Sequence, residues 1–191
     1  MARAQQSLFG EEVPRGFFYR DEFVSADEER ALVDEISRVG FSIFEMRGVV
    51  ARRRVAFFGK SYDSTTVAPP LPAFLMPLRR RVGAWAQVEA DAFAMALINE
   101  YPPGAPIGWH RDAPQYDIVA GVSLVSACRM KLRPYVSPPA QGGGRRAATH
   151  EIALAPRSAY LMTGPSRTDF EHHIPAVETL RYSITFRTLR R

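Results

Sequence analysis

Two short stretches of the sequence contain the residue types that hold a catalytic metal ion. The first contains His110 and Asp112, two positions apart, and the second contains His172 and His173. Residues two apart on a β-strand share a face, so His110 and Asp112 are able to point at one ion. Two imidazoles and a carboxylate on one side of a metal leave its other positions open, which suits non-haem Fe(II) binding oxygen and a second substrate. The residues alone leave His150, His172 and His173 open as the third ligand, and two side chains hydrogen bonded in a loop would give the same H-x-D pair.

Polar residues near both stretches form a candidate site for a short dicarboxylate. Asn99 and Tyr101 share one face of an expected strand, and a later expected strand over 181–189 has one apolar face. Its other face carries Arg181, Ser183, Thr185 and Arg187. At ~3.3 Å per residue the Cα atoms of Arg181 and Arg187 lie about 20 Å apart, and each side chain reaches roughly a third of that distance. The two guanidinium groups are therefore able to converge on a dicarboxylate through charge-assisted bonds, although either arginine alone would equally suit a surface position.

The elements that must position these residues change character along the chain. A helix is expected from the N-cap Ser25, with Glu28 completing a capping box, to Gly40, and a second helix over 74–88. A short strand and turn are expected over 17–23, a strand over 50–58, and then the strands 93–99, 107–111, 118–126, 128–135, 150–154, 158–163 and 181–189. Short strands this dense, separated by proline and glycine turns, predict a barrel or jelly roll, and helices placed early argue against an alternating βαβ fold.

The length and composition favour one domain. The chain has 191 residues, of which 46% are hydrophobic, and we expect a flexible leader over 1–13 and a single domain over 14–191. No run approaches the roughly 20 apolar residues that span a bilayer, so no membrane association is expected. The start resembles no secretory signal and Cys128 is the sole cysteine, which together favour a cytoplasmic protein. We expect a monomer.

The charge suggests a polyanionic partner. The formal net charge is +5 and the pI about 9.7, and Lys60 and Lys131 are the only lysines among 25 basic residues. Guanidinium groups bind phosphate bidentately, which favours nucleic acid. A genome rich in arginine codons would give the same composition.

Taken together, these motifs resemble the AlkB family of Fe(II)- and 2-oxoglutarate-dependent dioxygenases. The resemblance covers residues 90–190 well and the first half loosely. It is carried by Asn99-x-Tyr101, His110-x-Asp112, His172 and the spacing from Arg181 to Arg187. It implies an α+β, mainly β fold, a double-stranded β-helix (jelly roll) with N-terminal helices and a nucleotide-recognition lid. It also implies Fe(II) and 2-oxoglutarate as cofactors.

The resemblance assigns the metal ligands residue by residue. His110, Asp112 and His172 would bind the iron. His172 is preferred to His173 because the ligand histidine of the family sits two residues before an Ile-Pro pair, here Ile174-Pro175. His173 would then be a neighbour of the site.

The same resemblance assigns the residues around 2-oxoglutarate. Arg181, with Tyr101 and Ser183, would hold the carboxylate far from the metal. Arg187 and Asn99 would bind near its C1 end. The implied reaction is oxidative dealkylation of a base in DNA or RNA, in which oxygen and 2-oxoglutarate are converted to succinate and CO2 and a methyl group leaves as formaldehyde.

Substrate contacts are expected from residues 52–62. A base in a duplex must be flipped out to reach such a site, and this requires stacking and phosphate contacts. Tyr62 is the expected stacking residue and Arg54 the expected phosphate contact, with Phe58 as a second aromatic. The alternative is that Phe57 and Phe58 belong to the core and the three arginines at 52–54 form a solvated edge.

One position departs from the pattern of the family. Some members place an acid two residues after the metal-binding aspartate, where this chain has Pro114, and the nearest later acid is Asp117. Asp117 is therefore the candidate partner for a cationic alkylated base. The departure keeps open the same oxygenase chemistry on a protein side chain or small molecule, and a non-enzymatic metal- or DNA-binding module is a third reading. Trp109 has the opposite strand phase to His110 and is expected in the core.

The leader contains a candidate partner motif. The segment Gln5–Phe9, with sequence QQSLF, resembles the short peptide that docks bacterial repair proteins on the replication sliding clamp. Clamp docking would favour DNA over RNA as the target. The alternative is that Phe9 packs on its own domain.

Overall fold

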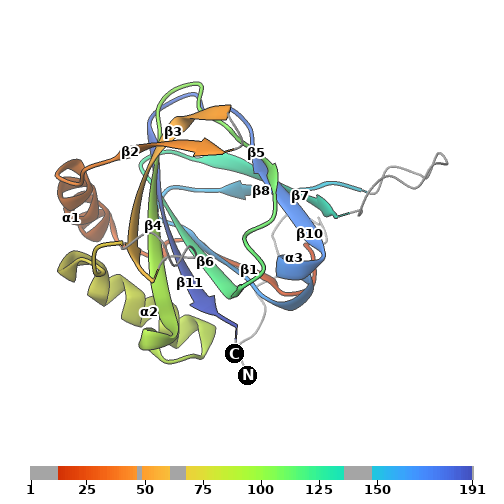
Figure 1. Ribbon diagram of the computed structural model, residues 1–191, viewed down its shortest axis with the longest axis horizontal. Helices are drawn as coiled ribbons and strands as arrows, with labels where there is room; N and C mark the ends of the chain where they lie inside the picture. The colour runs from red at the N-terminus through yellow and green to blue at the C-terminus, as the bar shows by residue number, and fades with distance from the viewer. Residues whose placement is uncertain (1–12, 47–48, 61–67, 136–147, 191) are drawn as a thin grey trace.

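The computed structural model describes residues 13–46, 49–60, 68–135 and 148–190, and within these two antiparallel β-sheets face each other (Figure 1). The two main helices lie on the outer side of the larger sheet. The predicted leader motif Gln5–Phe9 and the predicted stacking residue Tyr62 fall outside the described residues.

The larger sheet has seven strands in the order β1-β9-β6-β11-β4-β3-β2. Its strands are β1 (Phe17–Arg20), β2 (Ser42–Met46), β3 (Val49–Gly59), β4 (Phe93–Tyr101), β6 (Tyr116–Leu124), β9 (Ala159–Met162) and β11 (Arg181–Leu189). The smaller sheet has four strands in the order β5-β10-β7-β8. Its strands are β5 (Ile107–His110), β7 (Cys128–Pro134), β8 (His150–Leu154) and β10 (Phe170–Ile174). Most neighbouring strands in both sheets are not consecutive in the chain, which is the mark of a jelly roll rather than a meander.

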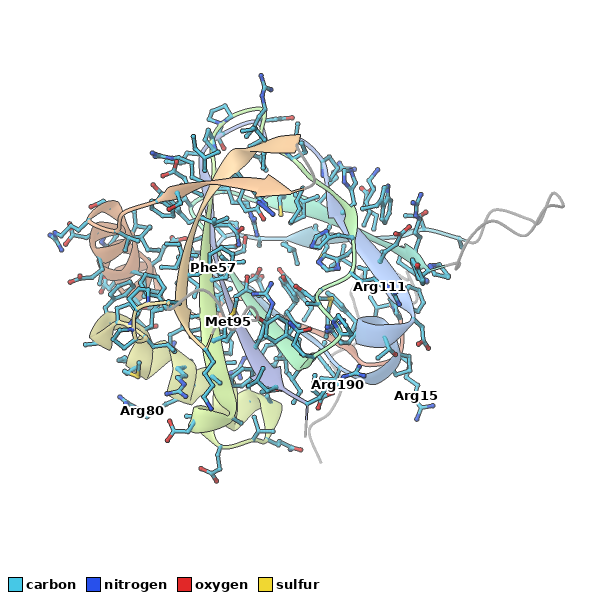
Figure 2. All side chains as sticks on the ribbon, in the orientation of Figure 1. Arg15, Phe57, Arg80, Met95, Arg111 and Arg190 are labelled. Atoms are coloured by element: carbon cyan, nitrogen blue, oxygen red, sulfur yellow. The ribbon has the colours of Figure 1, made fainter. Side chains whose placement is uncertain are left out.

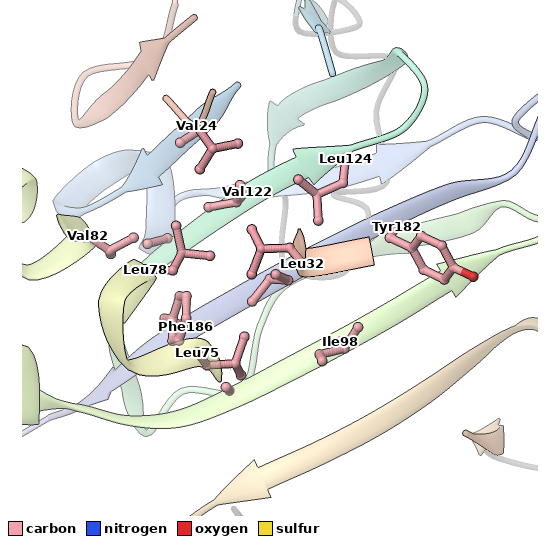
Figure 3. Close-up of a cluster of buried hydrophobic side chains, with 14 of the residues drawn as sticks. Val24, Leu32, Leu75, Leu78, Val82, Ile98, Val122, Leu124, Tyr182 and Phe186 are labelled. Atoms are coloured by element: carbon pink, nitrogen blue, oxygen red, sulfur yellow. The ribbon is translucent and has the colours of Figure 1, made fainter. Parts of the chain in front are cut away.

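The outer face of the larger sheet is covered by helices α1 (Ala26–Ser37) and α2 (Met76–Ala86). The 3-10 turn η1 (Ala73–Leu75) leads into α2, and the 3-10 turn η2 (Ala90–Ala92) leads from α2 into β4. The predicted capping box is present, because the Ser25 side chain accepts from the Glu28 backbone and the Glu28 carboxylate accepts from Ser25 N–H. Apolar residues of both helices meet the sheet in one buried cluster (Figure 3), which includes Leu32, Ile36, Leu78, Val82, Ile98, Val122, Ile184 and Phe186. This cluster anchors the sheet whose other face looks onto the smaller one.

The space between the two sheets is apolar at its ends and polar between them. One cluster there includes Met130, Leu132, Tyr160 and Met162, and another includes Val55, Met95, Leu97 and Tyr116. Strand β11 connects the two regions, because Arg181 lies opposite Tyr101 of the first cluster and Arg187 lies opposite Met95 of the second. The alternation predicted for β11 holds, so its polar residues point into this space while Ile184 and Phe186 pack against the helices.

Several elements differ from the sequence-based expectation. The strands expected over 150–154 and 181–189 have those bounds, but β2, β10 and the short helix α3 (Gly164–Thr168) were not predicted. The first helix ends at Ser37, before Gly40, and the second begins as a 3-10 turn and ends at Ala86. Strand β5 ends at His110, so Asp112 lies in the loop before β6 and not on the strand itself. Among the described residues, no helix is both long enough and apolar enough to cross a membrane.

Candidate active site

Two of the predicted metal ligands lie side by side between the sheets. His110 and His172 are Cα partners on β5 and β10, and their ring centroids are 4.1 Å apart. The Nδ1 atom of His110 lies 2.8 Å from the Gly108 carbonyl oxygen. A carbonyl only accepts, so Nδ1 carries the proton and Nε2 keeps its lone pair for a ligand.

His173 points the other way. Its ring stacks on Trp109 with centroids 5.1 Å apart, and its Nδ1 lies 2.7 Å from the Ile107 carbonyl oxygen. Alternation along β10 therefore puts His172 inside and His173 outside. Trp109 corrects an expectation, since it is only partly buried and lies beneath the Arg133 guanidinium, 4.1 Å from its ring centroid. The outer face of the smaller sheet, and not the core, holds this indole.

The carboxylate of Asp112 is buried beside the histidines but is bonded to an arginine. Its Oδ1 accepts from Nε and Nη2 of Arg187, at 3.1 and 2.8 Å. Burial opposes its charge, yet the Arg187 guanidinium, and then His172 and His110, hold the pKa of Asp112 well below its usual range. Among the described residues, no three His, Cys, Asp or Glu side chains already converge on one point as metal ligands. Both bonds from Arg187 go to Oδ1, so Oδ2 is the oxygen that would bind a metal held by the two imidazoles.

Both imidazoles are neutral near pH 7. Burial, and then the proximity of His110, lowers the pKa of His172 to about 3. Burial also lowers the pKa of His110, against the opposing pull of Asp112. Metals bind the neutral imidazole and the ionised carboxylate, so the protonation states present suit a metal without further proton loss.

Arg181 offers a buried, incompletely bonded cation for a carboxylate. It is 1% exposed, its Nε donates to Ser123 Oγ at 3.1 Å, and its guanidinium lies 5.0 Å from the centre of the Tyr101 ring. Its Nη1 has no hydrogen-bond partner among the described residues. A buried donor without a hydrogen-bond partner costs about 1–3 kcal/mol of stability, and more when it is charged. Such a donor is therefore typical of a ligand-binding site.

The other predicted 2-oxoglutarate residues surround the same strip of sheet. Asn99 and Ser183 are Cα partners, and Asn99 Nδ2 donates to Ser183 Oγ at 3.4 Å. The Oδ1 atom of Asn99 has no partner among the described residues. Arg187 differs from Arg181, because it is already engaged by Asp112 and its Nη1 lies 3.5 Å from Met95 Sδ. The two arginines are thus buried on one strand face as predicted, but they do not present equivalent open groups.

The predicted substrate residues of β3 lie on its outer face. Arg54 pairs with Glu100 at 2.6 Å, and Phe58 packs in the cluster beneath the helices. The inner face carries the odd-numbered neighbours of the buried Val55, which are Arg53 and Phe57. The expectation for β3 was therefore out of phase by one residue, and alternation counted from Val55 would have corrected it.

Arg53 is the inner residue of β3 that sequence reasoning missed. Its side chain is 7% exposed, and its charge acts on both His110 and Arg187. Phe57, at 39% exposed, is the more open aromatic residue of the same face. Asp117 and Pro114 are both exposed.

A groove on the helix side of the molecule does not coincide with these residues. It lies between α1 and α2, has a volume of about 340 Å³, and is lined in part by Leu32, Phe74 and Leu78. These residues belong to or pack on the helix side of the larger sheet. Proximity of titratable groups, and not cavity size, identifies the candidate site.

Comparison with known proteins defines the class. Residues 41–187 match the model of the 2OG-Fe(II) oxygenase superfamily, so the chain belongs to that superfamily. Fe(II) and 2-oxoglutarate are its cofactors. The residues present fit both cofactors. Fe(II) is bound by imidazoles and a carboxylate, which His110, His172 and Asp112 supply. A carboxylate of 2-oxoglutarate is bound by a guanidinium, which Arg181 supplies with an open nitrogen.

Individual relatives are consistent with the AlkB resemblance. The chain is 25% identical over 202 residues to the "Alkylated DNA repair protein ALKBH8 homolog" of Arabidopsis thaliana, covering 92% of this chain and 56% of that protein. This chain therefore spans little more than half the length of that relative. The structure of OsALKBH1 matches with a TM-score of 0.68 at 12% identity, over 93% of this chain and all of that one (100%). A Pseudomonas putida prolyl-4-hydroxylase matches with a TM-score of 0.62 at 16% identity, over 92% and 93%. The predicted resemblance and the predicted jelly-roll class are confirmed.

Proposed function

We propose that this oxygenase removes alkyl groups from bases of nucleic acid by oxidation, with DNA as the preferred target. The observation that carries the proposal is the inward-facing His110–His172 pair beside Asp112 and the open nitrogen of Arg181. The relative named as an alkylated-DNA repair protein supports the choice of nucleic acid.

The residues divide into two groups with separate tasks. His110, Asp112 and His172 would hold Fe(II), which supplies the activation of oxygen toward an alkyl carbon. Arg181 would donate its open nitrogen to the far carboxylate of 2-oxoglutarate.

Asn99, Tyr101 and Ser183 complete the proposed 2-oxoglutarate site. The Tyr101 ring supports the guanidinium of Arg181 from one side. Asn99 and Ser183 lie directly across the β4–β11 pair from each other, where a ligand held between the sheets would meet both. Arg187 would bind near the C1 end of 2-oxoglutarate.

Substrate contacts are proposed for β3 and the residues that follow it. Arg53 and Phe57 share the face that looks toward His110, and Tyr62 remains the proposed stacking residue. A flipped base needs a π-face and its phosphates need cations, and this segment has both.

A second candidate keeps the chemistry and changes the substrate. Pro114 stands where an acid would meet a cationic base, and the nearest later acid, Asp117, is exposed. An uncharged protein side chain or small molecule would not need that acid. The fold is shared with a prolyl-4-hydroxylase as well as with an AlkB homologue, so the fold does not choose between them.

One assay separates the two candidates. The protein is incubated with Fe(II), 2-oxoglutarate and oligonucleotides that each carry one methylated base, and the product mass and succinate are measured, with His172→Ala as the inactive control. We expect the oligonucleotide to lose the mass of one CH2 group, because hydrogen replaces the methyl group, and binding to weaken steeply between low and moderate salt. Turnover of 2-oxoglutarate with every oligonucleotide unchanged in mass would contradict the proposal and favour the second candidate.

The leader would recruit the enzyme to replicating DNA through Gln5–Phe9. Its glutamine and Leu8-Phe9 pair suit an apolar pocket on the sliding clamp. Pull-down with purified clamp should recover wild type and lose Leu8→Ala/Phe9→Ala, and equal recovery of both would remove this part of the proposal. A cytoplasmic, monomeric enzyme remains the expectation.

A further inference from the structure

A buried arginine holds the loop that carries Asp112. Arg167 lies in α3 and is 5% exposed. Its Nη2 is within hydrogen-bonding distance of three carbonyl oxygens, those of Asp112 at 3.1 Å, Ala113 at 2.5 Å and Tyr116 at 3.1 Å. One guanidinium group therefore contacts both ends of the segment that joins β5 to β6.

No sheet pairing holds this segment in place. Strand β5 ends at His110 and strand β6 begins at Tyr116, so residues 111–115 belong to neither ladder. Within the segment the backbone closes one turn, from Tyr116 N–H to the Ala113 carbonyl at 3.1 Å. The end of the segment near β6 is also held by a backbone bond, from Arg190 N–H to the Gln115 carbonyl at 2.8 Å. The backbone of Asp112 and Ala113, at the other end, depends on side chains that reach it from elsewhere.

The helix α3, which carries Arg167, is itself held by backbone hydrogen bonds to the residues just before β1. Thr163 and Ser166 form a capping box at the start of α3, and their backbone N–H groups donate to the carbonyls of Gly16 and Arg15 at 2.9 and 3.0 Å. Gly16 has φ +88°, and a Cβ there would lie 2.1 Å from the Thr163 carbonyl oxygen. This close approach requires glycine and packs α3 tightly against the start of β1.

Helix α3 also leads directly into the strand that carries His172. Strand β10 begins three residues after Arg167 and places His172 opposite His110. A second, exposed link runs in the opposite direction, because Arg111 Nη1 donates to the Thr168 carbonyl at 3.2 Å (Arg111 is labelled in Figure 2, beside β10). α3 is therefore the common base of the Asp112 loop and the His172 strand.

We propose that Arg167 is a positioning residue, which fixes the Asp112 loop against α3 so that the carboxylate stays within reach of His110 and His172. The inference rests on the metal site of the proposed function. Arg167 would touch neither metal nor substrate, and it would act only through the backbone of residues 112–116.

An electrostatic role and a positioning role for Arg167 predict opposite changes in metal affinity when the residue is replaced. Arg167 is a cation whose charge already acts on His172 and Asp112. If charge were its only effect, loss of this cation would strengthen the binding of a divalent metal. If it positions the loop, its loss would weaken metal binding, because partners that orient ligands are worth about 10–100-fold in metal affinity.

The test measures metal affinity and loop dynamics without turnover. Wild type, Arg167→Met and Arg167→Lys are titrated with Mn(II) in the absence of oxygen, and hydrogen exchange is followed at the amides of residues 112–116. Arg79→Met is the matched control, because Arg79 is also partly buried and donates from Nε to a backbone carbonyl, that of Phe93 at 2.9 Å, but on the helix side.

We expect Arg167→Met to bind Mn(II) about 10- to 100-fold more weakly and to exchange faster at 112–116. Arg167→Lys should recover part of both, while Arg79→Met should lose thermal stability and keep wild-type affinity. Unchanged or tighter Mn(II) binding by Arg167→Met, or weaker binding with wild-type exchange, would overturn the proposal. If Arg167→Met does not fold, the comparison of Arg167→Lys with wild type decides in the same terms. Failure of wild type itself to bind Mn(II) would instead count against the proposed function.

Discussion

The two faces of strand β11 show how one nine-residue segment serves stability and chemistry separately. On the helix side, Ile184 and Phe186 are fully buried among apolar side chains. On the inner side, Arg181 and Arg187 are also buried, yet both are charged. Burying a charge costs free energy unless it is paired, and Arg187 has its pair in Asp112 while Arg181 keeps an open nitrogen. A fold tolerates that cost where a ligand completes the bonding, so the inner face is where function is expected.

The largest effect should come from removing an inward imidazole. His172→Ala should reduce succinate formation to background, because the metal loses one of two nitrogen ligands. His173→Ala is the control one residue away on the outer face, and it should keep at least about half of the wild-type rate since surface substitutions are usually mild. The rates are measured as succinate released per minute at saturating 2-oxoglutarate. Equal loss in both variants would mean that β10 matters only as a strand.

The outer face should respond in stability instead. Phe186→Ala should lower the free energy of unfolding by about 3–5 kcal/mol, because it empties a fully buried site and removes an edge-on contact with Phe93. Denaturant unfolding measures this, with Leu189→Ala, at a partly exposed position, as the control that should change little. The 2-oxoglutarate requirement of the folded Phe186→Ala protein should stay near that of wild type. A large rise in that requirement would mean that the two faces are not separate.

Arg181 should respond in cofactor affinity. Arg181→Met removes a charge-assisted contact worth about 1.5–3 kcal/mol, so the concentration of 2-oxoglutarate for half-maximal rate should rise about 10- to 150-fold. Metal binding should change little, since Arg181 lies at the other end of β11 from the Asp112–Arg187 pair. An unchanged 2-oxoglutarate requirement would remove Arg181 from the cofactor site.

The smallest effect concerns a surface cap on the helix side. Arg81, and the Ser25 backbone N–H after it, lower the pKa of Glu28 to about 2. Because the pKa is depressed on folding, the stabilisation is fully present above the ordinary value of 4.5 and is lost as pH falls toward 2. Both partners are partly exposed, so Glu28→Gln should cost only about 0.5–1 kcal/mol at pH 7. Unfolding measured from pH 7 to 3 should show the difference between variant and wild type shrinking, and a constant difference would contradict this account.

The sequence predicted those features of the fold that depend only on residues close together in the chain. The alternation in β11 and the capping box at Ser25 needed only neighbouring residues, and both have the predicted form. Strand β10 was missed because its central residues, Glu171, His172 and His173, do not alternate apolar with polar. Its pairing with β5 and β7 is what makes it a strand.

The residues of the candidate site were likewise predicted only in part. The family resemblance identified His110 and His172 as a pair, and the fold brings them together. The phase of β3 was missed because Arg53 and Arg54 look alike in sequence, and only the burial of Val55 separates them. Nothing in the sequence pointed to Arg167. Its partners are backbone carbonyl oxygens about fifty residues away, and every residue type has such an oxygen.

The most direct measurement is a crystal structure of the protein grown without oxygen with Mn(II) and 2-oxoglutarate, with the metal located by anomalous scattering. The account predicts one metal peak bonded to His110, Asp112 and His172, and 2-oxoglutarate bonded to Arg181. A metal bound elsewhere, or 2-oxoglutarate bound away from Arg181, would contradict it.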